Sequence, residues 1–370
     1  MPKIIIDDKI PFIKGVFEKY AEVVYLPGGK ITPNDVKDAD ALIVRTRTKC
    51  NKALLENSTV KHISTATIGY DHINVKEVES LGITWNNAPG CNSSSVQQYF
   101  AAVLAAFVKD PKDLTLGVVG VGYVGKKVVA AAKALGLTVL QNDPPRAEKE
   151  GSANFVSLDE ICQKSDIVTI HVPLEYNGPH PTFHLFDSKV ISSMKKNSML
   201  INASRGEACD TQALIDALES KHLSKAFFDV WENEPEISSK LVNLSAIATM
   251  HIAGYSADGK ANGTSASVQA VAKKLNIPQL TNFVCQDIPL PPQGTEIVLN
   301  KEDDTFTQVK TAILYTYNIL EDDKALRNNL TSFEELRGKY PIRREFPAFN
   351  VYNANNKAKE ILQNLGFNVK

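Results

Sequence analysis

The sequence has no long hydrophobic run, no excess of either charge and few cysteines. Its longest apolar stretch, Tyr99–Val108, is far shorter than the roughly 20 residues that span a bilayer. Residues 1–10 lack the apolar core of a signal peptide. The formal net charge is −1, which gives no electrostatic reason to bind nucleic acid or an anionic membrane. These absences predict a cytoplasmic protein that acts without a membrane or a nucleic acid.

The five cysteines are scattered along the chain, and none belongs to a C-x-x-C pair. An odd number of isolated cysteines argues against a disulfide framework and against a zinc site, so we expect no bound metal. The 370 residues, 43% of them hydrophobic, suffice for two or three globular domains.

A glycine-rich turn stands out in a strand–turn–helix context. Gly120, Gly122 and Gly125 follow the apolar run Leu116–Val119 and open an alanine-rich stretch, 126–135, that is typical of a helix. The glycines allow a pyrophosphate to approach the backbone closely, and the helix N-terminus offers N–H donors to it. This context predicts a dinucleotide-binding site.

An acidic residue follows the next predicted strand. The run 137–141 leads to Asp143, where a carboxylate accepts hydrogen bonds from the ribose hydroxyls and repels a 2′-phosphate. The acid therefore favours NAD over NADP as cofactor. Arg146 weakens this argument, since a nearby arginine is able to accommodate the extra phosphate.

The alternation of short β-branched runs with helical patterns predicts an α/β fold with parallel sheets. We expect two doubly wound domains: a flavodoxin-like substrate domain, 1–92 and 257–285, and a Rossmann NAD-binding domain, 93–256. Helices are expected at 11–20 and 51–57, and long helices from Ser93 and over 257–275 would link the two domains beside an active-site cleft. The expected strands are 3–6, 23–26, 41–44, 62–65 and 83–85, then 116–119, 138–141, 167–170, 199–202, 225–229 and 246–249.

A proline-rich linker, Pro289–Gly294, precedes the last part of the chain. We expect residues 286–370 to form a small α+β domain, which would be marginally stable alone and would gain by packing against a second copy. The sequence therefore favours a homodimer. The expected elements are strands at 296–299 and 349–352 and helices at 305–328, 333–339 and 357–365.

Three residues at the ends of successive predicted strands suggest catalysis. They are Arg205, Glu234 and His251. Oxidation of an alcohol by hydride transfer needs a base, for which histidine is suited, and a carboxylate on the other ring nitrogen stabilises the imidazolium. An arginine holds a substrate carboxylate with two parallel hydrogen bonds. Taken alone, each residue is more simply a surface or structural group; together, after a cofactor motif, they favour a dehydrogenase.

These motifs resemble the D-isomer-specific 2-hydroxyacid dehydrogenase family. The resemblance rests on the glycine motif and on the segments Asn202–Gly206, Asp229–Pro235 and His251–Tyr255. It implies that Arg205 clamps the substrate, His251 is the general acid/base and Glu234 is its partner. The further segments 65–72, 88–92, 143–146 and 343–345 resemble a branch that oxidises 4-phospho-D-erythronate with NAD in vitamin B6 biosynthesis, and in which the last domain serves dimerisation.

The same resemblance implies which residues contact the ligands. Thr46 and Thr67 would contact the substrate. The cofactor site would consist of Gly120, Gly122, Tyr123, Val124, Gly125, Asp143, Val172, Ala203, Ser204, Arg205, Asp229, Gly254 and Tyr255.

A phosphorylated substrate also needs a cationic pocket away from the hydride centre. Our hypothesis is that the phosphate is bound by Arg45 or Arg47 of one chain together with Arg344 of the partner subunit. For Arg47 it is equally plausible that the side chain is simply a solvated basic residue at a strand edge. Two alternatives for the function stay open at this point. They are oxidation of 3-phosphoglycerate or another D-2-hydroxyacid, and a sensor that binds NADH without turnover.

Overall fold

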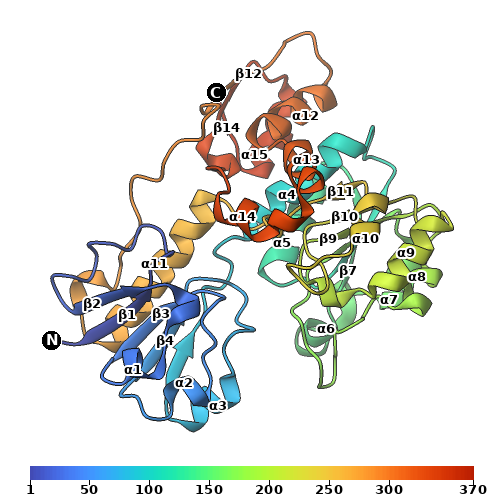
Figure 1. Ribbon diagram of the computed structural model, residues 1–370. Coiled ribbons are helices and arrows are strands. Elements are labelled where there is room, and N and C mark those ends of the chain that lie inside the picture. The colour runs from blue at the N-terminus through green and yellow to red at the C-terminus, as the bar shows by residue number, and fades with distance from the viewer. The chain divides into compact units, whose positions relative to one another are not determined.

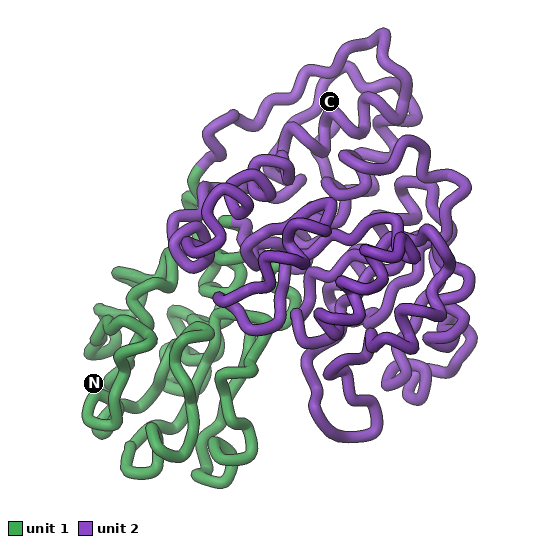
Figure 2. The backbone as a smooth tube through the Cα atoms, turned by 45° about the vertical axis from the view of Figure 1, so that its right-hand side comes forward, with its two compact units in different colours: residues 1–92, 257–289 green, residues 93–256, 290–370 purple.

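The computed structural model describes residues 1–370, which form two compact units. Figure 2 shows the first unit, residues 1–92 and 257–289, and the second, residues 93–256 and 290–370. The segment that we expected to be a third domain thus lies in the same compact unit as the predicted Rossmann domain. No helix combines the length and the apolar character needed to cross a membrane.

The first unit is built on a five-stranded parallel sheet with the order β2-β1-β3-β4-β5. This order is typical of flavodoxin-like domains, which confirms the predicted fold class. Its strands are β1 (Lys3–Asp7), β2 (Glu22–Leu26), β3 (Ala41–Val44), β4 (His62–Thr65) and β5 (Thr84–Asn86).

Both faces of this sheet are covered by helices, as Figure 1 shows. Alternate strand residues point to opposite faces, so Ile4 packs with Val268 of one helix whereas Ile5 packs with Val36 of another. The covering helices are α1 (Pro33–Val36), α2 (Lys52–Leu55) and α3 (Val75–Ser80) on one face and α11 (Ala257–Lys274) on the other.

The helix predicted at 11–20 is wrong, because these residues form a series of turns. Ile13 and Phe17 are buried and have helical spacing, which explains the prediction. The backbone, however, has φ of 62° at Phe12 and 85° at Gly15. Left-handed residues do not continue a right-handed helix.

The second unit contains a six-stranded parallel sheet with the order β11-β10-β9-β8-β6-β7. The chain order reverses between β6 and β8, and open α/β sheets bind ligands at such a switch point. The sheet confirms the predicted nucleotide-binding fold. Its strands are β6 (Thr115–Val119), β7 (Thr138–Asn142), β8 (Ile167–Ile170), β9 (Met199–Asn202), β10 (Lys225–Phe228) and β11 (Ile247–Ala248).

Helices cover this sheet, and the first of them is almost entirely buried. Tyr99 and Phe100 are at most 1% exposed, because this helix packs on other helices as well as on the core of the sheet. The helices are α4 (Ser93–Phe107), α5 (Tyr123–Ala134), α6 (Pro144–Glu150), α7 (Leu158–Lys164), α8 (Ser188–Ser193), α9 (Thr211–Glu219) and α10 (Ser239–Leu244).

The C-terminal segment adds a small three-stranded parallel sheet and four helices. It shares one hydrophobic core with the Rossmann part, since α12 packs on α4 and α15 on α5. Its elements are β12 (Glu296–Val298), α12 (Thr305–Thr316), α13 (Ile319–Asn328), α14 (Phe333–Gly338), β13 (Asn350–Tyr352), α15 (Asn356–Leu365) and β14 (Asn368–Val369).

The single helix predicted at 305–328 is therefore wrong, since it is two helices. Tyr317 between them is extended, with φ of −155° and ψ of 105°. Its ring is buried, and its hydroxyl donates to Asp322 over 2.9 Å. Asn318 then caps α13 by accepting from the backbone of Leu320.

Candidate active site

The glycine turn between β6 and α5 has the shape that a pyrophosphate requires. Gly120 has φ of 85°, and a methyl group there would lie 2.7 Å from the carbonyl of His171 at the end of β8. A methyl group at Gly125 would lie 2.1 Å from the carbonyl oxygen of Gly120, so both positions need glycine for packing. Gly122 faces open space and gives α5 no side-chain cap. The backbone N–H groups that begin α5 are thus left for an anion, and the turn fits NAD.

Asp143, at the end of β7, is tied to this turn. Its Oδ2 accepts from the backbone of Val121 over 2.8 Å, and its Oδ1 caps α6 by accepting from the backbone of Arg146. The Arg146 guanidinium donates to the Val121 carbonyl over 2.7 Å and pairs with Glu150. These partners within the chain compete with a 2′-phosphate for Arg146, which favours NAD.

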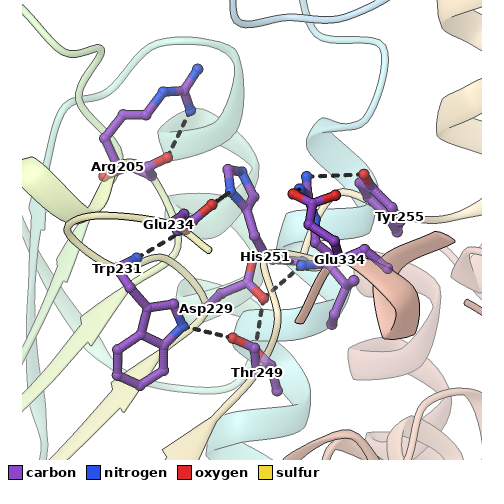
Figure 3. A network of polar contacts seen from close by, with 12 residues as sticks. Arg205, Asp229, Trp231, Glu234, Thr249, His251, Tyr255 and Glu334 are labelled. Atoms are coloured by element: carbon purple, nitrogen blue, oxygen red, sulfur yellow. Dashed lines mark hydrogen bonds and ion pairs between the residues drawn. The ribbon is translucent and has the colours of Figure 1, made fainter. Parts of the chain in front are cut away.

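Glu234 and His251 form the centre of the polar network in Figure 3. His251 Nδ1 and Glu234 Oε2 are 2.7 Å apart, and the other carboxylate oxygen accepts from the backbone of Trp231 over 3.0 Å. Burial favours the neutral acid, but the charge and hydrogen bond of His251 outweigh it and hold the pKa of Glu234 below its usual range. The pair thus combines an ionised carboxylate with an imidazole whose Nε2 is left to exchange a proton.

The loop that carries His251, residues 249–254 (the His251 loop), is held by the buried carboxylate of Asp229. Asp229 accepts from the Thr249 hydroxyl and from the backbone N–H groups of Ile252 and Ala253, at 2.7, 2.7 and 2.8 Å. We expected Asp229 to contact the cofactor. Asp229 is 1% exposed, and the contacts of its carboxylate within the chain shape the loop. The cofactor contact stays a prediction.

Arg205 lies in the turn after β9, as expected. The Asn202 side chain closes this turn by accepting from the backbone of Ser204 and donating to the carbonyl of Arg205 over 2.8 Å. The Ser204 hydroxyl also bonds to Asn202, and Arg205 Nη1 donates to the Ser204 carbonyl. Gly206 then touches the neighbouring loop, because a methyl group there would lie 1.9 Å from the carbonyl carbon of Trp231.

The remaining cofactor candidates of the second unit lie in these same loops and turns. Tyr123, the first residue of α5, is 64% exposed. Tyr255, labelled in Figure 3, follows the His251 loop, and its hydroxyl accepts from Arg337 over 3.0 Å. The other four, which are neither buried nor fully exposed, are Val124, Val172, Ala203 and Gly254.

The substrate candidates of the first unit lie at the carboxyl ends of β3 and β4, which are neighbours in the sheet. After β3, Thr46 and Arg47 are exposed, and Arg45 donates to the carbonyl of Lys9 over 3.1 Å. After β4, Thr67 donates to the carbonyl of Gly69 over 2.8 Å.

Thr65 lies beneath this turn, where its hydroxyl contacts both Thr67 and His72. Arg344 belongs to the second unit, where its carbonyl accepts from Gln98 over 2.9 Å.

Sequence reasoning missed two arginines beside the His251 loop. Arg337 contacts Tyr255, and Arg343 donates to the carbonyls of Ile252 and Ala253. Both come from the C-terminal segment, some eighty to ninety positions along the chain from the groups that they contact. The segment 343–345 carries the family resemblance, but no local pattern shows that Arg337 or Arg343 contacts these groups, because the partners are distant in the sequence.

Comparison with known proteins accounts for both halves of the second unit. Residues 90–253 match the D-isomer specific 2-hydroxyacid dehydrogenase, NAD binding domain. Residues 290–366 match a domain of unknown function. Solved structures with the same fold include the TT0316 protein of Thermus thermophilus (TM-score 0.64, 24% identity, covering 74% of this chain and 97% of that one). Another is a D-lactate dehydrogenase of Aquifex aeolicus complexed with NAD and lactic acid (TM-score 0.63, 25% identity, covering 77% and 99%).

Sequence relatives extend over nearly the whole chain. The erythronate-4-phosphate dehydrogenase of Bacteroides thetaiotaomicron is 46% identical over 354 residues, which cover 94% of this chain and 99% of the relative. The enzyme of the same name in Escherichia coli is 38% identical over 374 residues, covering 99% and 98%. The chain therefore belongs to the D-isomer specific 2-hydroxyacid dehydrogenase family, in the group formed by the erythronate-4-phosphate dehydrogenases.

Proposed function

We propose that this protein oxidises the C2 hydroxyl of 4-phospho-D-erythronate with NAD, giving (R)-3-hydroxy-2-oxo-4-phosphooxybutanoate, in the synthesis of pyridoxal 5′-phosphate. The observation that carries the proposal is the 2.7 Å contact between His251 and Glu234 in the same unit as the glycine turn. The names of the full-length relatives support the substrate.

In this mechanism His251 is the general base. Because Nδ1 faces Glu234, Nε2 takes the proton of the C2 hydroxyl, and the ionised carboxylate stabilises the imidazolium that forms. Arg205 holds the substrate carboxylate and draws electron density from the C2 oxygen. NAD, when bound on the glycine turn and Asp143, supplies the hydride acceptor.

The first unit would bind the rest of the substrate. We assign the carboxylate end to Thr46 and Thr67, and the phosphate to Arg45 or Arg47 with Arg344 of the partner subunit. Guanidinium groups suit a phosphate because they bind it with two hydrogen bonds. Replacing each arginine by alanine should raise KM for a phosphorylated substrate far more than for an unphosphorylated one. An equal rise for both would remove that arginine from the assignment.

The decisive assay follows NADH formation from NAD with 4-phospho-D-erythronate, 3-phospho-D-glycerate or D-lactate, in the presence of a carbonyl trap. We expect turnover of phosphoerythronate that His251→Ala abolishes. Turnover of phosphoglycerate alone would keep the mechanism and replace the substrate. No turnover of any hydroxyacid, with NADH still bound, would refute the proposal in favour of a sensor.

We also propose that the protein acts as a homodimer in the cytoplasm, with the C-terminal segment at the dimer interface. Light scattering after size exclusion tests the assembly. A species of twice 40.6 kDa is expected, and a monomer of 40.6 kDa at micromolar concentration would contradict it.

A further inference from the structure

The backbone of the His251 loop is held from two sides by groups of opposite charge. Asp229 accepts its N–H groups at Ile252 and Ala253, and Arg343 donates to the carbonyls of the same two residues over 2.9 and 2.6 Å. The same guanidinium nitrogen donates to the Ser95 hydroxyl, which in turn bonds to the Ala253 carbonyl. The peptide unit between Ile252 and Ala253 thus has polar partners on both edges, and the peptide unit on either side of it has one.

The burial of the charged Arg343 side chain lowers the stability of the fold. Arg343 is only 4% exposed, and its guanidinium stacks on the ring of Tyr317 with 4.3 Å between the charge centre and the ring centroid. The nearby acid, Asp322, is buried and accepts from the hydroxyls of Tyr317 and Tyr340 rather than pairing with Arg343 directly. A buried arginine that lacks a direct carboxylate partner costs stability. The hydrogen bonds of Arg343 to the carbonyls of Ile252 and Ala253 offset part of this loss of stability.

A second arginine of the same segment contacts the residue that follows the loop at Gly254. Arg337 donates to the Tyr255 hydroxyl over 3.0 Å and pairs with Glu334 over 3.1 Å. Burial raises the pKa of Glu234, and the charge of Arg337 helps to lower it, after the larger contributions of His251 and of the Trp231 backbone N–H. Both arginines belong to the part of the chain that matches a domain of unknown function.

We propose that the C-terminal segment completes the catalytic centre, with Arg343 as a positioning residue that fixes the His251 loop and so sets the position of the imidazole. This inference rests on the proposed role of His251 as base. It assigns to the segment a task in catalysis that is independent of dimerisation. Reaction rates depend steeply on such placement, since a shift of about 1 Å costs roughly 100-fold.

The chain offers a matched control for this test. Arg327 also comes from the C-terminal segment and also donates to two carbonyls of the Rossmann part, those of Val242 and Ser245, over 2.7 and 2.8 Å. It makes no contact with the His251 loop. Arg343→Met and Arg327→Met both remove an arginine that ties the segment to the Rossmann part, but only the first removes hydrogen bonds to the His251 loop.

Steady-state kinetics should separate the two variants. We expect Arg343→Met to lower kcat at least tenfold with KM for NAD within twofold of wild type, and to move the acid limb of the pH–rate profile. Arg343→Lys, which keeps one donor for these carbonyls, should recover part of the rate. Arg327→Met should lower the melting temperature yet keep kcat and the pH profile. If Arg343→Met is folded and has wild-type kcat and pH profile, or if Arg327→Met loses as much rate, the proposal is refuted.

Hydrogen–deuterium exchange tests the same idea without any substrate. Arg343→Met should speed exchange at the amides of Ile252 and Ala253, whereas Arg327→Met should leave them unchanged. Should Arg343→Met fail to fold, Arg343→Lys is measured instead, and unchanged exchange and kcat there would refute the proposal. Absence of turnover in the wild type would overturn the proposed reaction, whereas unchanged exchange would overturn the positioning role.

Discussion

Replacing Glu234 by glutamine isolates the contribution of its charge to catalysis. The two oxygens of Glu234 each accept from one donor, His251 Nδ1 and the backbone N–H of Trp231. A glutamine whose oxygen accepts from Trp231 turns its NH2 group toward His251 Nδ1, which then accepts and leaves the ring proton on Nε2. The substitution therefore removes the negative charge and favours the tautomer in which Nε2 is unable to act as base.

The size of the effect follows from the 2.7 Å contact. A hydrogen bond to a charged group contributes about 1.5–3 kcal/mol, and this contribution grows as His251 takes the proton in the transition state. If all of it is lost there, kcat/KM falls about 10- to 150-fold. The acid limb of the kcat/KM profile should move to lower pH, because the imidazolium loses the carboxylate that stabilises it.

The assay is initial-rate NADH formation across pH 5 to 9, with Glu232→Gln as control. Glu232 lies in the same loop and has the same kinds of partner, His184 Nε2 at 2.7 Å and the backbone N–H of Thr211 at 2.9 Å. It makes none of the contacts of the Glu234–His251 pair. A wild-type profile for Glu234→Gln, or an equal loss of rate in Glu232→Gln, would refute the assignment of Glu234 as the partner of the base.

Three further substitutions test the fold of the site. Gly206→Ala places a methyl group 1.9 Å from the Trp231 backbone and should destabilise the protein by at least about 2 kcal/mol in urea unfolding; an unchanged midpoint would contradict this. Gly122→Ala meets no atom within 4 Å, so it should keep the melting temperature but weaken NADH binding, measured by fluorescence; unaltered binding would remove the turn from the cofactor site. Burial lowers the pKa of His171 to about 3, so its unfolded form takes up a proton below pH 6.5 while the folded form does not. Stability is then lost as the pH falls, by about 2 kcal/mol between pH 7 and 5. In His171→Asn the loss of stability between pH 7 and 5 should be smaller by this amount, as measured by urea unfolding at each pH. If the wild type and the variant lose the same stability, His171 does not cause the loss.

The sheets were the most predictable part of this fold. Buried parallel strands are continuous apolar runs, and the bounds predicted for β3, β4, β8 and β9 are those in the structure. The helices were less predictable where tertiary packing decides. Ile13 and Phe17 have helical spacing, yet the backbone around them forms turns. Tyr317 is extended and buried, and it separates two helices where the local sequence favours one.

The candidate site was predictable to the extent that it lies at strand ends. The contact between Glu234 and His251 was expected from their positions after β10 and β11, and the structure places them 2.7 Å apart. Their catalytic roles stay a prediction, as do the ligand contacts assigned to Thr46 and Arg45. The contacts of Arg337 and Arg343 with this site had no local signal, since their partners come from distant parts of the chain.

Two acids that follow the same strand take different tasks because their donors differ. Asp229 receives one hydroxyl and two backbone N–H groups, none of which exchanges a proton in the mechanism, so these contacts set the shape of the His251 loop. Glu234 receives an imidazole, and its charge therefore acts on a proton transfer. Arg343 holds the same loop by donating to the carbonyls of Ile252 and Ala253. The position of the base thus depends on residues from 229 to 343, which explains why its sequence motif, although specific, does not contain all the groups that hold it in place.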